Sequence, residues 1–131
     1  MIFDRVRKKF VALSPEEWVR QHVLVYLIEE KQFPESLLAV EKEVKVVSRN
    51  LRPDIVLFSR DLKPIFLVEC KAPLVEINEN VLAQAANYNY SLGLRHVFLT
   101  NGNSHFFLEL GANGLFEIKN EIPIYTELVE E

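Results

Sequence analysis

Two short apolar segments joined by a polar turn restrict the fold of this chain more than any other feature of its sequence. Pro53–Phe58 and Ile65–Lys71 are rich in Ile, Val, Leu and Phe, and they flank the polar segment Ser59–Pro64. Apolar runs of this length, bounded by turn residues, are typical of paired strands. They predict an antiparallel hairpin, and symmetry about the middle of the turn pairs Phe58 with Ile65.

Three charged residues should meet at the open end of this hairpin. The same symmetry sets Asp54 opposite Glu69, and strand alternation turns Glu69 and Lys71 to one side. Facing carboxylates repel, and a hard dication such as Mg²⁺ relieves the repulsion. Lys71 would add a positive donor beside the metal. We expect a site for metal-dependent phosphodiester hydrolysis; the alternative is a surface network in which Lys71 and nearby arginines pair with both acids.

The remaining elements predict an α/β fold. The segment Ser14–Glu17 reads as the start of a helix, with an N-cap, a proline at the first position and a capping-box glutamate, and the helix should run to about Lys31. Alternating residues predict a strand at Leu38–Val47, and a second helix is expected at Asn78–Leu92. Further strands are expected at His96–Thr100, His105–Leu110 and Leu115–Lys119, with an Asn101-Gly102 turn. The order α-β-β-β-α-β-β indicates a central mixed β-sheet flanked by helices.

Bulk properties set the remaining limits. A length of 131 residues favours a single domain over residues 1–131. The one cysteine, Cys70, cannot form an internal disulfide, which fits a reducing compartment. The basic N-terminal residues are not followed by the apolar stretch of a secretory signal, and no apolar run is long enough to span a bilayer. We therefore expect a cytoplasmic protein with no membrane partner. The formal net charge of -4 argues against binding nucleic acid with the whole surface.

The hairpin motif and its surroundings resemble a known family. Pro53-Asp54 and Glu69-Cys70-Lys71 stand at the spacing of the PD-(D/E)xK nuclease motif. Four further segments resemble the N-terminal nuclease domain of type I restriction enzyme R subunits: Ser14–Gln21, Val68–Pro73, Gln84–Tyr88 and Leu99–Gly102. The likeness extends from about Ser14 to Leu110.

The resemblance implies a restriction-endonuclease-like core and Mg²⁺-dependent cleavage of DNA, with Mn²⁺ able to replace Mg²⁺. Asp54 and Glu69 would bind the metal, the Cys70 backbone carbonyl would complete the shell, and Lys71 would be the catalytic lysine. The Cys70 side chain itself alternates to the face opposite Glu69, so we expect it to be packed.

The resemblance also implies satellite residues. The family has a glutamate on the first helix, which maps to Glu17 or, as second choice, Glu16; the capping box explains Glu17 equally well. A Gln-x-x-x-Tyr motif matches Gln84 and Tyr88, which share a helix face and are expected to contact phosphate or DNA. Arg52 could face either solvent or a phosphate.

For the remaining polar residues, a structural position is favoured over a role in the chemistry. Arg20 and Gln21 could orient the helix glutamate or line a DNA path, although a surface position is the favoured interpretation. The three histidines have no partner at metal spacing: His22, His96 and His105.

A complete R subunit carries helicase motor domains, and this chain has neither room for them nor a Walker-type sequence. It is therefore either a fragment or a free-standing relative, and its expected partners are DNA and other restriction-system subunits or the missing motor domains. Two alternatives stay open. One is a non-catalytic DNA-binding or assembly module with the nuclease fold, and the other is a resolvase or repair nuclease of the same superfamily.

Overall fold

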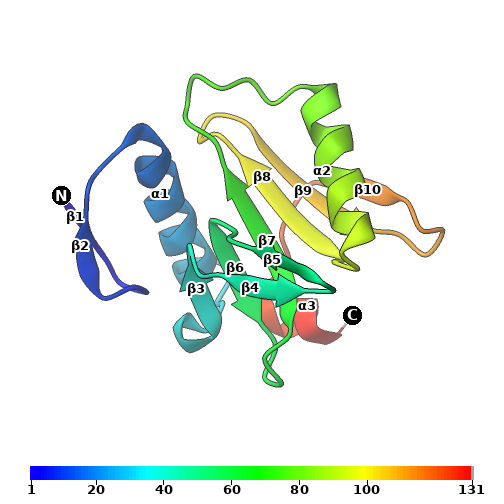
Figure 1. Cartoon of the computed structure of the whole chain (residues 1–131), viewed down its shortest axis with the longest axis horizontal. Coiled ribbons are helices and arrows are strands. Elements are labelled where there is room, and N and C mark those ends of the chain that lie inside the picture. Colours follow the sequence, from blue (N-terminus) through cyan, green and yellow to red (C-terminus); the bar gives the residue numbers. More distant parts are fainter. Residues whose placement is uncertain (131) are drawn as a thin grey trace.

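The computed structural model describes residues 1–130, and its centre is a six-stranded mixed sheet in the order β10-β9-β8-β7-β6-β3 (Figure 1). Only β7 and β8 run parallel; the other neighbours are antiparallel. The strands are β3 (Leu38–Val40), β6 (Ile55–Phe58), β7 (Pro64–Cys70), β8 (His96–Thr100), β9 (His105–Leu110) and β10 (Phe116–Lys119). The expected central mixed sheet is confirmed.

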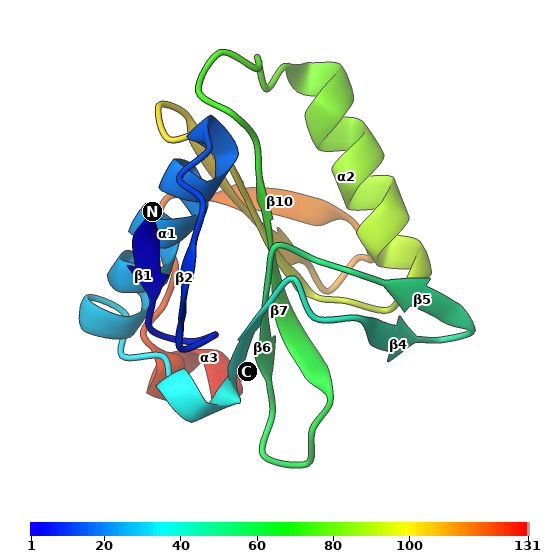
Figure 2. The ribbon, with the colours of Figure 1, turned by 60° about the vertical axis from the view of Figure 1, so that its left-hand side comes forward.

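Helix α1 (Pro15–Glu29) covers one face of the sheet (Figure 2). Ser14 Oγ accepts a hydrogen bond from Glu17 N at 3.1 Å, which confirms the predicted N-cap. The helix buries Val19, Leu24 and Leu27 against the even-numbered positions of β7. On the same side lie the short helices η1 (Glu35–Leu37) and α3 (Tyr125–Glu130) and a small hairpin of β1 (Ile2–Asp4) and β2 (Lys9–Val11).

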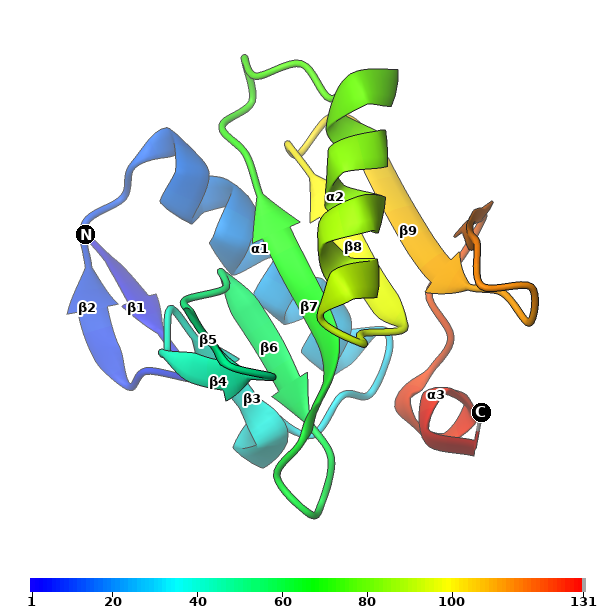
Figure 3. The same cartoon turned by 45° about the vertical axis from the view of Figure 1, so that its right-hand side comes forward.

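Helix α2 (Glu79–Ser91) and a hairpin of β4 (Val44–Val46) and β5 (Arg49–Leu51) lie on the other face (Figure 3). Asn78 caps α2 by accepting from Val81 N at 3.0 Å. Only Asn89 is buried among the residues of α2 itself. The helix is therefore lightly packed, and the second core on this side consists mainly of Val44, Val46, Val56, Leu67, Leu92 and Leu94.

The prediction of one continuous strand at Leu38–Val47 is wrong. It divides into β3, which pairs with β6, and β4, which pairs with β5. Glu41 lies between them with a φ of 50°, a left-handed conformation that interrupts an extended strand. The break lets the chain cross from the sheet to the layer that holds α2. The β1–β2 hairpin, β5 and α3 were not predicted.

The central hairpin keeps its predicted register at the end that matters for the site. Ile55 pairs with Val68, as symmetry about the turn requires. The predicted pairing of Phe58 with Ile65 is wrong, because a bulge between Leu57 and Phe58 makes Phe58 face Pro64. The bulge lies next to the turn, so the predicted pairing of β6 with β7 is unchanged at the open end of the hairpin. Asp54 immediately precedes β6 at that end.

Candidate active site

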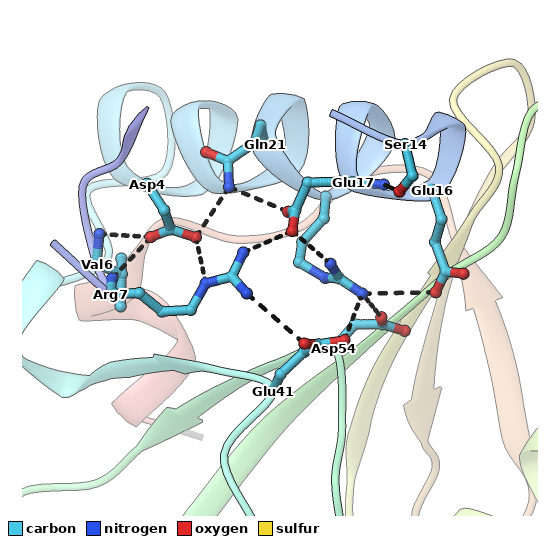
Figure 4. Close-up of polar contacts among 10 residues, drawn as sticks. Asp4, Val6, Arg7, Ser14, Glu16, Glu17, Gln21, Glu41 and Asp54 are labelled. Carbon is cyan, nitrogen blue, oxygen red and sulfur yellow. Dashed lines mark hydrogen bonds and ion pairs between the residues drawn. The ribbon is translucent and has the colours of Figure 1, made fainter. Parts of the chain in front are cut away.

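Asp54 is fixed by contacts with two elements, and Figure 4 draws the contact with α1. Its Oδ1 accepts a hydrogen bond from Arg20 Nη2 on α1 at 2.6 Å, and its Oδ2 accepts from the backbone N of Cys70 on β7 at 2.8 Å. The side chain of Asp54 is 15% exposed and that of Arg20 is 6% exposed. The carboxylate is thus turned toward α1 and held in one orientation. The expectation that Arg20 and Gln21 lie at the surface is wrong, since both are buried.

Glu16 is the helix glutamate that lies beside Asp54. Partial burial, together with the charge of Asp54 and a hydrogen bond between the two carboxyl groups, raises the pKa of Glu16. Arg20 and Lys71 act in the opposite direction on the same group, so their charges also reach it. Arg20 Nη2 lies 3.5 Å from Glu16 Oε1 and 2.6 Å from Asp54 Oδ1, so one guanidinium group bridges the two carboxyl groups.

Glu17 points into a different set of contacts. Its Oε1 accepts from Arg7 Nη2 at 2.7 Å and pairs with Arg20 Nη1 at 3.0 Å, while its Oε2 accepts from Gln21 at 3.1 Å. Burial alone would raise the pKa of Glu17, but these donors hold it below its usual range. The Glu17 side chain is 7% exposed, whereas that of Glu16 is 48% exposed and shares Arg20 with Asp54, so the geometry reverses the order of preference and favours Glu16 as the partner of Asp54.

The network continues into the β1–β2 hairpin. Asp4 is fully buried, and its Oδ1 accepts from the backbone N atoms of Val6 and Arg7 at 2.8 and 2.7 Å. Its Oδ2 accepts from Arg7 Nε and Gln21 Nε2, both at 2.8 Å. Asp4, Arg7, Glu17, Arg20 and Asp54 thus form a continuous chain of short polar contacts from the hairpin to the candidate site (Figure 4).

Sequence reasoning missed this chain of contacts. Asp4 and Arg7 belong to a common local turn, in which an Asp side chain accepts hydrogen bonds from the backbone N–H groups two and three residues on. That spacing could have indicated that Asp4 and Arg7 are ordered, but not that Arg7 reaches α1.

Glu69 lies on the opposite side of β7 from Cys70. Its half-buried side chain lines a cavity of about 150 Å³ under α2, together with Arg52, Tyr88 and Asn89. Tyr88 is 40% exposed, and the Arg49 guanidinium lies 5.7 Å from its ring centre. The structure therefore groups Glu69 with two of the three predicted DNA-contact residues.

The third predicted DNA-contact residue, Gln84, is exposed on α2 and is not among the residues that line this cavity. Lys71 follows β7, and its backbone N donates to Thr100 O at 2.8 Å. The predicted packing of the Cys70 side chain is confirmed: it is 2% exposed in the core beneath α1, where burial raises the pKa of its thiol.

The donor chemistry fits a divalent cation at Asp54 and Glu16. Two adjacent carboxyl groups, one with a raised pKa, are relieved by a hard cation, and Mg²⁺ typically takes one or two carboxylates plus waters. Within residues 1–130, no group of three or more His, Cys, Asp or Glu side chains is arranged to hold a metal ion. The positive charge beside Asp54 comes from Arg20. A metal contact by Glu69 or the Cys70 carbonyl stays a prediction.

Comparison with known proteins decides the family. Residues 15–123 match the family described as the type I restriction enzyme R protein N terminus (HSDR_N). The chain belongs to this family. This match confirms the resemblance noted from the motifs. The chain is a nuclease-like domain of the R-subunit type. The matched region includes Asp54, Glu69 and Lys71 but leaves the β1–β2 hairpin outside.

Two solved structures share the fold of this R-protein N-terminal domain. One is the fragment structure of a putative HsdR subunit of a type I restriction enzyme from Vibrio vulnificus YJ016, with 23% identity and a TM-score of 0.57 over 92% of this chain and 25% of that one. The other is a putative nuclease belonging to DUF820 from Anabaena variabilis ATCC 29413, with 13% identity and a TM-score of 0.55 over 95% of this chain and 79% of that one.

The chain thus spans about a quarter of the restriction-subunit fragment. No curated protein matches it. No helix among the described residues is both long and apolar enough to cross a lipid bilayer.

Proposed function

We propose that this R-protein N-terminal domain is a Mg²⁺-dependent DNA endonuclease module. The observation that supports this most is that Arg20 Nη2 lies 2.6 Å from Asp54 Oδ1 and 3.5 Å from Glu16 Oε1, so the two carboxyl groups flank one cation. Two carboxylates and an ammonium group are the residue types that phosphodiester hydrolysis with a hard metal requires. The family match supplies the restriction-system context.

In this proposal Asp54 and Glu16 hold Mg²⁺, for which Mn²⁺ can substitute. When bound, the metal polarises the scissile phosphate and lowers the pKa of a coordinated water. The chain's own residues orient the reaction. Arg20 and the Cys70 amide fix both oxygens of Asp54, and Lys71 donates to the attacking water or to a phosphate oxygen.

The motif assigns Glu69 as the third acidic residue of the proposed site, and its side chain would enter the site from the cavity under α2. Its neighbours Arg52 and Tyr88 would hold a phosphate next to the one that is cut. Gln84, one helical turn before Tyr88, would contact the same strand farther along.

Cleavage of supercoiled plasmid DNA tests the proposal. Wild-type protein with Mg²⁺ or Mn²⁺ should nick the plasmid, whereas Asp54→Asn, Glu16→Gln and Lys71→Ala should each lower the rate by at least about 100-fold. Glu43→Gln, an exposed carboxylate variant in the loop before β4, is the matched control and should retain the wild-type rate. Equal rates in wild type and all three site variants, or no nicking by any of them, would end the proposal.

A second function, a DNA-binding or assembly module without catalysis, is favoured by one observation. Arg20 already supplies the counter-charge to Asp54, and the side chain of Glu69 lies in a separate cavity. Such a module would retain a DNA duplex in a salt-dependent manner in EDTA and would leave the plasmid intact when Mg²⁺ is added.

A further inference from the structure

A groove of about 400 Å³ lies between α1 and the strands β8 and β9, outside the residues assigned above. Its walls are aromatic. The rings that line it are Trp18, His22 and Tyr26 on α1 and Phe98, His105 and Phe107 on the strands. The three helix residues are spaced by one turn each, so they form a single stripe along the helix.

These aromatic side chains are open to solvent to an unusual degree. Trp18 is 43% exposed and Tyr26 is 38% exposed, although the neighbouring stripe of α1 is almost completely buried. The rings of Trp18 and His22 lie 4.3 Å apart, and His22 Nδ1 lies 2.8 Å from Trp18 O, so the two rings form one ordered surface. An exposed aromatic stripe beside a pocket is typical of a binding site.

One end of the groove adjoins the candidate active site. Thr100 and Gly102 line that end, and Thr100 O accepts the hydrogen bond from the backbone of Lys71. The β8–β9 turn lies beside the first turn of α1 (Figure 2), so close that a Cβ at Gly102 would come within 3.4 Å of the Trp18 ring. A nucleotide joined to a phosphate at the active site would extend past this turn to reach the groove.

We propose that this groove takes an unstacked nucleobase of the DNA strand that is cut. Every base has a π-face that can stack on aromatic rings irrespective of sequence. At the rim, the exposed Asn120 supplies an amide group that can hydrogen-bond a base edge. The inference rests on the proposed nuclease function and adds a substrate class, namely DNA with a single-stranded or frayed segment at the cut site.

The nucleobase is favoured over an apolar protein segment for two reasons. One end of the groove lies next to a site that would hold phosphate, and its rim includes Lys119, a cation that also pairs with Glu117 at 3.1 Å. The one acidic residue that lines it, Glu121, is paired with Lys31 at 2.8 Å.

Trp18 reports directly on the groove, because it is the single tryptophan of the chain. Oligothymidylate should be titrated against the full chain in EDTA, where no cleavage occurs, and the tryptophan fluorescence recorded. We expect saturable quenching, with oligothymidylate bound about tenfold or more tightly than an abasic strand of equal length. A blunt duplex should quench weakly.

Two variants locate the effect. Tyr26→Ala should weaken oligothymidylate binding about tenfold, whereas Tyr90→Ala, which removes a 56% exposed ring from α2, should leave it unchanged. Circular dichroism of both variants should match that of the wild type. Absent quenching, or equal binding of the abasic strand, overturns the proposal. The proposal is also overturned if light scattering gives the mass of two chains and the tryptophan fluorescence changes with protein concentration alone. A second copy of the chain would then cover the groove.

The groove and the nuclease can fail separately. Lys71→Ala should abolish nicking and retain the quenching, because Lys71 does not line the groove. Nicking without quenching would disprove the base site alone, whereas quenching without nicking would disprove the catalytic function alone.

Discussion

Arg20 donates a 2.6 Å hydrogen bond to Asp54, and the two side chains come from residues 34 positions apart in the sequence. Burial alone would lower the pKa of Arg20, but the hydrogen bond to Asp54 and the charges of Asp54 and Glu17 raise it. Arg20 therefore stays charged. This buried cation takes part of the charge-balancing role that we assign to a metal ion.

Removing Arg20 should destabilise the protein and make its stability depend on metal. Arg20→Met leaves Asp54 and Glu17 with an unbalanced negative charge, so the free energy of unfolding should fall by about 3 kcal/mol. Urea unfolding should show that Mn²⁺ recovers more stability in this variant than in the wild type, because the cation replaces the lost charge. Arg5→Ala removes an exposed arginine paired with Glu29 and Glu35 and should change little. An Arg20→Met variant as stable as wild type without metal would contradict this account.

The two helix glutamates should separate in a metal-binding measurement. Glu16→Gln should lower the affinity for Mn²⁺, followed by electron paramagnetic resonance, by about tenfold or more, because it removes a proposed ligand. Glu17→Gln should retain most of the affinity and instead lower the urea midpoint, because Glu17 pairs with Arg7 and Arg20. The opposite pattern would restore Glu17 as the metal carboxylate.

Arg7 should act as a positioning residue from outside the family match. Arg7→Ala breaks the contacts with Asp4 and Glu17, so Arg20 loses a fixed neighbour and Asp54 is held less firmly. We expect the nicking rate to fall about tenfold and Arg7→Lys to recover part of it. Lys9→Ala, at an exposed site on the same hairpin, is the control. If Arg7→Lys recovers the stability of the fold but no activity, the proposed positioning role is wrong.

Asp4 should make stability sensitive to acid. Burial would raise the pKa of Asp4, but hydrogen bonds from the backbone and side chain of Arg7 and from Gln21 lower it below the ordinary value of 3.8. A lowered folded-state pKa gives stability that is fully present above the unfolded value and is lost as pH falls through the folded value. The urea midpoint of the wild type should therefore drop below about pH 4, and this drop should be smaller in Asp4→Asn. Parallel pH profiles for the two proteins would disprove the assignment.

The hairpin could be predicted from the sequence because its evidence is local. Apolar runs, a polar turn and strand alternation determine which residues of β6 and β7 face each other, and the pairing of Ile55 with Val68 follows. The caps at Ser14 and Asn78 are equally local. By contrast, the bulge at Phe58 and the left-handed residue Glu41 depend on how the turn and the crossing segment pack, which periodicity does not encode.

The polar network could not be predicted, because its members come from four separate elements or loops. Arg20 has no sequence neighbour that reveals Asp54 as its partner, and an arginine in the first turns of a helix is usually at the surface. The choice between Glu16 and Glu17 likewise depends on where Arg7 lies, and Arg7 belongs to a hairpin of three-residue strands that carries little strand signal. Residue types were sufficient to suggest the chemistry, but the tertiary contacts decide which carboxylate faces Asp54.

A crystal of the protein soaked in Mn²⁺ gives the most direct test of the proposed metal centre, through the anomalous signal of the ion. The account predicts a peak in contact with the carboxylates of Asp54 and Glu16. A saturating soak without a peak at these two residues, or with the ion bound elsewhere, would contradict it.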